Sequence, residues 1–148
     1  MKEYKLTFEF VPEECWRGSL YHLLPTDAWD KIRRNAYARA GYKCSMCGTR
    51  GKLEAHEKWE YDDERALQTL VDVIALCHRC HEVKHISRTY AVGRGKDAEE
   101  WFMQVNGCSQ MEYHEALGKA NEEYIERNKV EGWTTNFSFL EKFNNNKK

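Results

Sequence analysis

Four cysteines form two pairs, Cys44/Cys47 and Cys77/Cys80, with two residues between the members of each pair. Two thiolates three positions apart at a turn hold one Zn²⁺ from the same side, and two such pairs supply the four ligands of a tetrahedral site. Zinc would also stabilise this polar segment, which has few apolar side chains to bury. The spacing therefore predicts a structural zinc ion bound by all four cysteines.

Three histidines lie close to these pairs in the sequence. Residues 48–76 separate the two pairs, a longer insertion than in a simple zinc ribbon, and this insertion carries His56. His81 and His85 follow Cys80 and are four positions apart, so on a helix they share one face and bind the same ion. We expect a second divalent cation (Zn²⁺, Mn²⁺, Ni²⁺ or Mg²⁺) near the three histidines. The alternative is a single zinc ion, with His81 and His85 as surface or supporting side chains.

Residues 29–88 resemble the HNH endonuclease family, whose members with a four-cysteine zinc have a treble-clef, or ββα-metal, core. Three ordered motifs carry the resemblance: Gly-Tyr-Lys-Cys-Ser-Met-Cys-Gly (41–48), Leu-Glu-Ala-His-Glu (53–57) and Leu-Cys-His-Arg-Cys-His-Glu-Val-Lys-His (76–85). The resemblance implies that a hairpin supplies a metal ligand and then a general base. It also implies that a later residue shapes the hairpin and that the following helix supplies the last metal ligands.

By this resemblance, His56 occupies the ligand position of the hairpin, and Glu57 occupies the position of the general base. Asp72 takes the place of the usual Asn, and His81 and His85 are the helix ligands. Glu57 and Asp72 depart from the usual pattern. A carboxylate accepts a proton from water efficiently only when its pKa is raised toward the working pH.

A second register of the same motif stays open. In that register His56 is the base, Ala55 leaves the first metal position empty, and Glu54 or Asp72 helps to bind the ion. In either register, the resemblance implies a metal-dependent endonuclease that hydrolyses phosphodiester bonds in DNA. The alternative is a catalytically impaired zinc module of the same fold that binds nucleic acid or a protein partner.

Charge is unevenly distributed along the chain, although the formal net charge is only −1. Segment 53–72 is mainly acidic, whereas the flanking segments 26–52 and 73–95 are mainly basic. Carboxylates suit a divalent cation, and basic flanks suit a nucleic-acid backbone. We expect phosphate contacts, which carry no sequence information, from five arginines: Arg33, Arg34, Arg39, Arg88 and Arg94.

The sequence predicts an α+β fold in three parts: an N-terminal strand and linker (1–25), an HNH-like zinc core (26–88) and a helical C-terminal extension packed on the core (89–148). A protein partner would bind through that extension. Apolar periodicity and capping residues predict helices over 26–40, 64–70, 78–87, 97–106 and 109–130. Thr26 is the expected N-cap of the first helix, and Ser109 and Glu112 form a capping box at the start of the last. They predict a strand over 4–11, with Tyr4, Leu6, Phe8 and Phe10 on one face, and a strand over 52–60. The apolar stretch from Trp133 is expected to form a strand or an extended arm packed on the first strand.

Location follows from what the sequence lacks. No run of 18 apolar residues is present, and the first residues lack the apolar core of a signal peptide. We therefore expect a cytoplasmic protein without a membrane partner, in a compartment where thiols stay reduced and available to metal.

Overall fold

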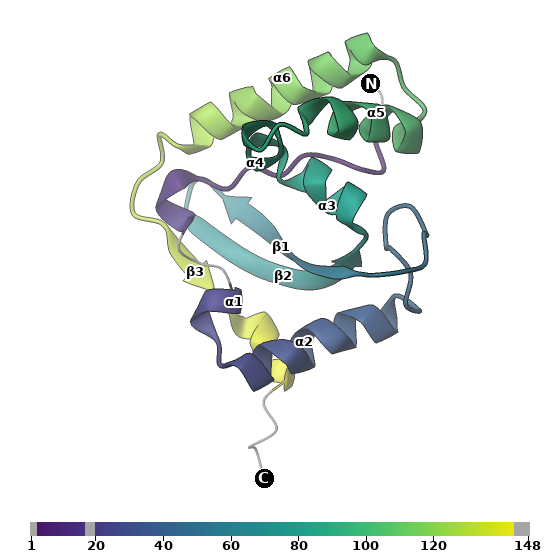
Figure 1. Ribbon diagram of the computed structural model, residues 1–148. Helices are drawn as coiled ribbons and strands as arrows, with labels where there is room; N and C mark the ends of the chain where they lie inside the picture. Colours follow the sequence, from purple (N-terminus) through teal and green to yellow (C-terminus); the bar gives the residue numbers. More distant parts are fainter. Residues whose placement is uncertain (1–2, 17–19, 144–148) are drawn as a thin grey trace.

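The computed structural model describes residues 3–16 and 20–143 and has a mixed α+β fold. Its centre is a β-hairpin, β1 (Glu54–Asp62) and β2 (Leu67–Leu76), and β3 (Thr134–Asn136) extends the sheet in the order β1-β2-β3. Helix α2 (Thr26–Arg39) lies on one side of the sheet, and α3 (His78–Lys84) lies on the other (Figure 1). The remaining elements are η1 (Glu13–Cys15), α1 (Leu20–Leu23), α4 (Ile86–Ala91), α5 (Gly95–Asn106), α6 (Gln110–Arg127) and η2 (Ser138–Phe143).

The hairpin forms because β2 supplies side chains to two apolar layers, and a register shift opposite Lys58 and Trp59 puts Leu70 and Val73 on the same side. Leu70 and Val73 are buried against α2, whereas Leu76 is buried on the side of α3. Asp62 accepts hydrogen bonds from the backbone N–H groups of Glu64 and Arg65, and these bonds close the turn. The predicted helix over 64–70 is therefore wrong: its first residues form the turn, and the strand pairing of the rest outweighs their helix propensity.

Two apolar cores lie on opposite sides of the sheet. The core toward α3 contains Leu76, Val83, Phe102 and Tyr113, which come from β2, α3, α5 and α6. The core toward α2 combines Leu20, Ile32, Ala36, Leu70 and Val73, and Phe137, Phe139 and Leu140 pack against it. The C-terminal extension thus covers both sides of the hairpin, and the burial of these side chains holds β1 and α3 in fixed positions.

The N-terminal segment is extended, but it is not a strand. Leu6 is fully buried, and Tyr4, Phe8 and Phe10 pack on the same core, so the predicted shared face is confirmed. The backbone of Leu6 exchanges two hydrogen bonds of 2.9 Å with the Asn106 side chain instead of pairing with a strand. The predicted strand over 4–11 is wrong because the segment lies against helices rather than against the sheet edge.

The helices follow the predictions with shifted ends. Helix α2 is capped by Pro25 rather than by Thr26, and α6 begins with the predicted Ser109–Glu112 capping box. The predicted helix over 78–87 is divided at His85, where φ is −105° and ψ is 55°, into α3 and α4. The C-terminal stretch forms a strand, one of the two predicted alternatives, but β3 pairs in parallel with β2 instead of packing on a strand of the N-terminal segment. Across the described ranges, none of the helices combines the length and the apolar character that a bilayer crossing requires.

Candidate functional site

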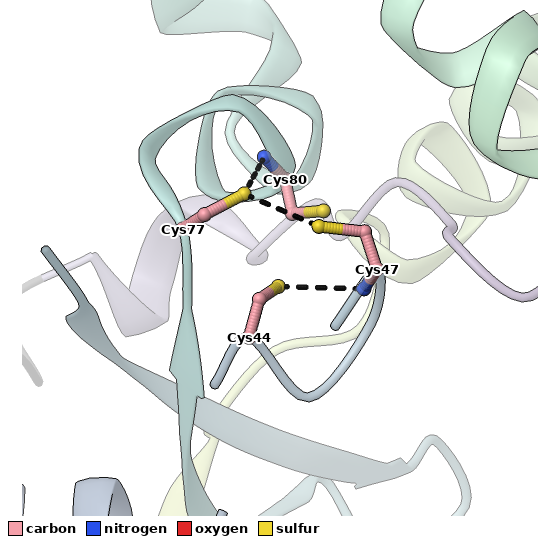
Figure 2. Close-up of side chains that lie close together, drawn as sticks. All are labelled: Cys44, Cys47, Cys77 and Cys80. Atoms are coloured by element: carbon pink, nitrogen blue, oxygen red, sulfur yellow. Dashed lines mark hydrogen bonds between the residues drawn. The ribbon is translucent and has the colours of Figure 1, made fainter. Parts of the chain in front are cut away.

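The four predicted cysteines converge. Cys44 and Cys47 lie in the tight loop between α2 and β1, where Gly48 has a φ of +79°. Cys77 caps the N-terminus of α3, and Cys80 lies in its first turn. All four sulfur atoms lie within 4.8 Å of one another, with 3.6 Å between those of Cys47 and Cys77. Figure 2 shows the two pairs facing each other across a small space, the arrangement of a tetrahedral thiolate site.

Hydrogen-bond donors surround these sulfur atoms. Cys44 accepts bonds from the backbone N–H groups of Met46 and Cys47, and Cys77 accepts one from that of Cys80. The indole N–H of Trp101 donates to the Cys80 sulfur at 3.3 Å. The hydrogen bond with Cys80, together with these amide donors, lowers the pKa of the Cys44 thiol, whereas burial and the neighbouring sulfur atoms raise the pKa values of Cys77 and Cys80 until a cation is present. N–H donors stabilise thiolates, the form that binds metal, so the donor set fits a structural zinc ion.

The three predicted histidines form a second cluster. One nitrogen of each ring, on His56, His81 and His85, lies within 4.8 Å of the others. The ring centroids are separated by 5.3 Å (His56–His81), 5.2 Å (His56–His85) and 4.8 Å (His81–His85). His56 is only 4% exposed, whereas His85 reaches the surface. Three convergent imidazoles with one open side suit a divalent metal that keeps room for another ligand.

Local structure explains why these rings meet. Side chains alternate along β1, so Glu54 and His56 point to the same face, the one that α3 covers. His81 and His85 are one helical turn apart. The backbone N–H of His85 still donates to the carbonyl of His81 at 3.2 Å, so the turn is intact although α3 ends there. The helix therefore presents both rings to the strand.

Two of the three rings also contact a carboxylate. Nδ1 of His81 lies 2.7 Å from Glu54, and Nε2 of His56 lies 2.7 Å from Glu9. Metal-binding histidines usually donate their second N–H to a carboxylate, which fixes the ring and its tautomer. Both contacts are therefore expected features of a metal site rather than of a simple aromatic cluster.

Glu9 is the site residue that the sequence did not indicate. It comes from the N-terminal segment and also pairs with Lys84 at 3.1 Å. The Lys84 ammonium, which is buried, donates a further bond to Thr7. Glu9 stands at a polar position in an alternating segment, which is an ordinary surface pattern. Only the packing of this segment along α3 brings Glu9 to His56.

The pKa values in the cluster favour neutral rings at His81 and His85 and an ionised Glu9. Desolvation by the surrounding side chains lowers the pKa of His81, and desolvation together with repulsion from His81 and His56 lowers the pKa of His85, although part of this ring reaches the surface. Burial alone would raise the pKa of Glu9, but the His56 contact and the Lys84 charge outweigh it and lower this pKa to about 2. At neutral pH the imidazoles of His81 and His85 are therefore in the form that binds metal.

A cavity of about 490 Å³ opens beside the histidines. Glu57, the next residue along β1, also lines it, and its carboxylate accepts a 2.6 Å hydrogen bond from the backbone N–H of Leu20. Burial raises the pKa of Glu57, although this N–H opposes the effect. Because β1 is an edge strand, residues from both of its faces reach the same cavity. Glu57 is thus a carboxylate with weakened acidity beside the histidine cluster.

Most of the other predicted site residues do not line this cavity. Asp72 is absent from the described lining of the cavity, and its carboxylate pairs with Arg39 and with the backbone N–H of Val73. Arg33 pairs with Asp30, and Arg94 pairs with Glu82 and Asp97. Arg34 is exposed on α2, on the opposite side of the sheet from α3. Of the five predicted arginines, Arg88 lines the cavity.

Comparison with protein-family models, with curated proteins and with solved structures found no match for this chain. The functional argument therefore depends on the residues themselves: a thiolate cluster, a histidine cluster with supporting carboxylates, and a cavity that begins at the histidines.

Proposed function

We propose that this protein is a metal-dependent HNH-type endonuclease that hydrolyses phosphodiester bonds in DNA. The observation that carries the proposal is the convergence of three histidines close to the four-cysteine cluster. His56 comes from β1 of the hairpin, and His81 and His85 follow Cys80 on and just after α3. The order of elements, hairpin followed by helix, supports a ββα-metal or treble-clef reading of the core. The four cysteines would hold a structural zinc, and the three histidines would hold a second divalent cation.

The histidine geometry supports the first of the two registers. His56 lies with the helix histidines, whereas Ala55 packs in the core toward α2. The second register needs Glu54 or Asp72 as a further metal ligand, but Glu54 contacts His78 and His81, and Asp72 pairs with Arg39. In the first register Glu57 takes the position of the base. Its raised pKa and its place in the cavity suit a group that takes a proton from water.

Each part of the site has a role in phosphodiester hydrolysis. A divalent cation at the three histidines would stabilise the negative charge that grows on the phosphate in the transition state. Glu9 and Glu54 orient two of the rings, and Arg88 at the cavity wall attracts the phosphate backbone. Glu57 accepts the proton of the attacking water, and the Leu20 N–H fixes the direction of its carboxylate.

Two contacts favour the alternative of a catalytically impaired zinc module. The Glu57 carboxylate is already bound by the Leu20 N–H at 2.6 Å, and the Asp72 carboxylate pairs with Arg39 rather than with the hairpin histidine. A protein with both groups engaged in this way would bind nucleic acid or a protein partner through the same fold without cleaving it.

Plasmid nicking separates the two functions. Supercoiled DNA is incubated with wild-type protein and Zn²⁺, Mn²⁺, Ni²⁺ or Mg²⁺, alongside His56→Ala and His85→Ala. His114→Ala is the matched control because His114 is an exposed histidine on α6. We expect the two cluster variants to lose at least 100-fold in nicking rate and the control to keep the wild-type rate. Equal nicking by all four proteins would refute the site, and two bound ions without nicking would favour the impaired module.

A further inference from the structure

The cavity beside the histidines has one wall that the hydrolytic mechanism does not use. Its aromatic lining residues include Trp16, which follows η1, Tyr21 in α1, Trp29 in α2 and Trp59 in β1. Trp29 and Trp59 are partly buried in the core toward α2. Trp16 and Tyr21 differ, since they are 61% and 67% exposed. Large aromatic side chains left in water beside a candidate site indicate a surface that binds something flat and apolar.

The charges of the cavity indicate which part of a substrate enters it. Among its described lining residues, Arg88 is the sole arginine or lysine, and it stands on the side of the histidines with His85, Ile86 and Ser87. The Glu9 carboxylate contacts Lys84 and His56. The Glu57 carboxylate accepts a hydrogen bond from the Leu20 N–H. A phosphate therefore belongs at the histidine end, and an uncharged group belongs at the aromatic end.

The volume also suits such a group. About 490 Å³ lies within the roughly 300–1,000 Å³ of typical small-molecule pockets, which is ample for one nucleobase and its sugar. Bases inside a duplex are stacked on their neighbours and cannot present a face to Trp16 or Tyr21. Only an unpaired base, or one rotated out of the stack, reaches an aromatic wall next to a backbone phosphate.

We propose that Trp16 and Tyr21 stack on an unpaired base of the strand whose phosphate lies at the three histidines, which makes single-stranded or locally unpaired nucleic acid the preferred ligand. This inference rests on the proposed function for the position of the phosphate. The aromatic contact itself requires no cleavage. Stacking on aromatic side chains tolerates any base, so the preference concerns strandedness rather than sequence.

Binding measurements test the proposal without relying on catalysis. The His85→Ala background prevents cleavage, and fluorescence anisotropy gives the Kd of a labelled single-stranded DNA oligonucleotide and of the same sequence as a duplex. In this background we compare Trp16→Ala and Tyr21→Ala with Tyr42→Ala, an exposed aromatic outside the described cavity lining. Circular dichroism checks that each variant is folded.

We expect tighter binding of the single strand than of the duplex. Each cavity variant should weaken single-strand binding about 5- to 150-fold, the range that loss of one base–aromatic stack produces, while Tyr42→Ala has no effect. Single-strand binding should also quench tryptophan fluorescence less in Trp16→Ala than in its parent. Unchanged single-strand affinity in both cavity variants, or an equal loss in Tyr42→Ala, would overturn the inference.

The two proposals fail in different ways. If wild-type protein nicks DNA but the cavity variants bind single strands normally, the endonuclease stands and the stacking wall is refuted. If the wild type never nicks DNA but Trp16→Ala loses single-strand affinity, the aromatic wall stands as the binding surface of an impaired module. Loss of duplex and single-strand affinity by the same factor would also refute a base-stacking role.

Discussion

Replacement of Glu9 should weaken both metal binding and stability, and comparison with Lys84→Met separates the two effects. Glu9 holds Nε2 of His56 at 2.7 Å and the Lys84 ammonium at 3.1 Å. Loss of a carboxylate behind a metal-binding histidine costs about 10- to 100-fold in metal affinity. Glu9→Gln keeps an oxygen acceptor for the ring, so we expect about tenfold, or about 1.4 kcal/mol. Glu9→Ala removes the acceptor, and we expect about 100-fold, or about 2.7 kcal/mol.

The ion pair with Lys84 predicts a second, independent effect. The Lys84 side chain is 6% exposed, so Glu9→Gln leaves a buried ammonium without its anion. Removing one partner of a buried pair costs about 3–5 kcal/mol, and the partial exposure of Glu9 places the loss near 3 kcal/mol. Lys84→Met lowers stability as well, but it leaves the Glu9–His56 contact in place. Lys84→Met should therefore keep the wild-type affinity for the second ion.

Isothermal titration calorimetry of Zn²⁺ into protein that already holds its thiolate zinc measures this affinity, and urea unfolding measures stability. Glu3→Gln is the matched control, since Glu3 is an exposed carboxylate in the same segment. Wild-type affinity in folded Glu9→Ala would show that Glu9 does not orient His56. An equal loss of affinity in Lys84→Met would show that the effect comes from the fold and not from the histidine contact.

Three further predictions concern the framework. Gly95→Ala places a Cβ atom 2.0 Å from the Tyr90 ring, so we expect the free energy of unfolding in urea to fall by about 1–3 kcal/mol. Gly118→Ala, at a helix position with free space, should raise it by about 0.5–1 kcal/mol. Equal effects would contradict the described packing. Burial raises the pKa of Tyr113 above its usual 10.0, so the stability that its neutral hydroxyl contributes is complete below pH 10 and is lost as pH rises further. Tyr113→Phe should flatten this part of the curve of unfolding free energy against pH. An unchanged slope would contradict the assignment. Chelation of the thiolate zinc should unfold the core around α3, with loss of far-UV circular dichroism that added Zn²⁺ restores; an unchanged spectrum after complete metal removal would show that the zinc is not structural.

Periodic and paired features of the sequence predicted their structures well. The Cys-x-x-Cys spacing predicted the two thiol pairs, and the i,i+4 spacing of His81 and His85 predicted that these two rings lie together; the hairpin and the packing of α3 then join the two thiol pairs and bring His56 to both rings. The Ser109 capping box is present as predicted. Each of these signals is local: a turn, a helical face or a cap fixes the geometry over a few residues, and tertiary contacts do not overrule it.

Long-range contacts were the part that the sequence did not reveal. Strand propensity in Tyr4–Val11 was correct about the buried face but not about the partner, since Leu6 bonds to Asn106 in α5. The helix prediction over 64–70 failed because strand pairing with β1 and β3 decides the conformation there. Glu9 was missed for the same reason. Its meeting with His56 depends on how a separate segment packs, which no local pattern encodes.

The core toward α2 is assembled from both ends of the chain: Leu20 and Ile32 come early, whereas Phe137, Phe139 and Leu140 come late. During synthesis, α2 and the hairpin leave the ribosome well before the last of these C-terminal side chains. The apolar face of the core toward α2 is therefore uncovered during that interval. Such delayed closure slows folding and exposes the growing polypeptide to chaperones and to self-association.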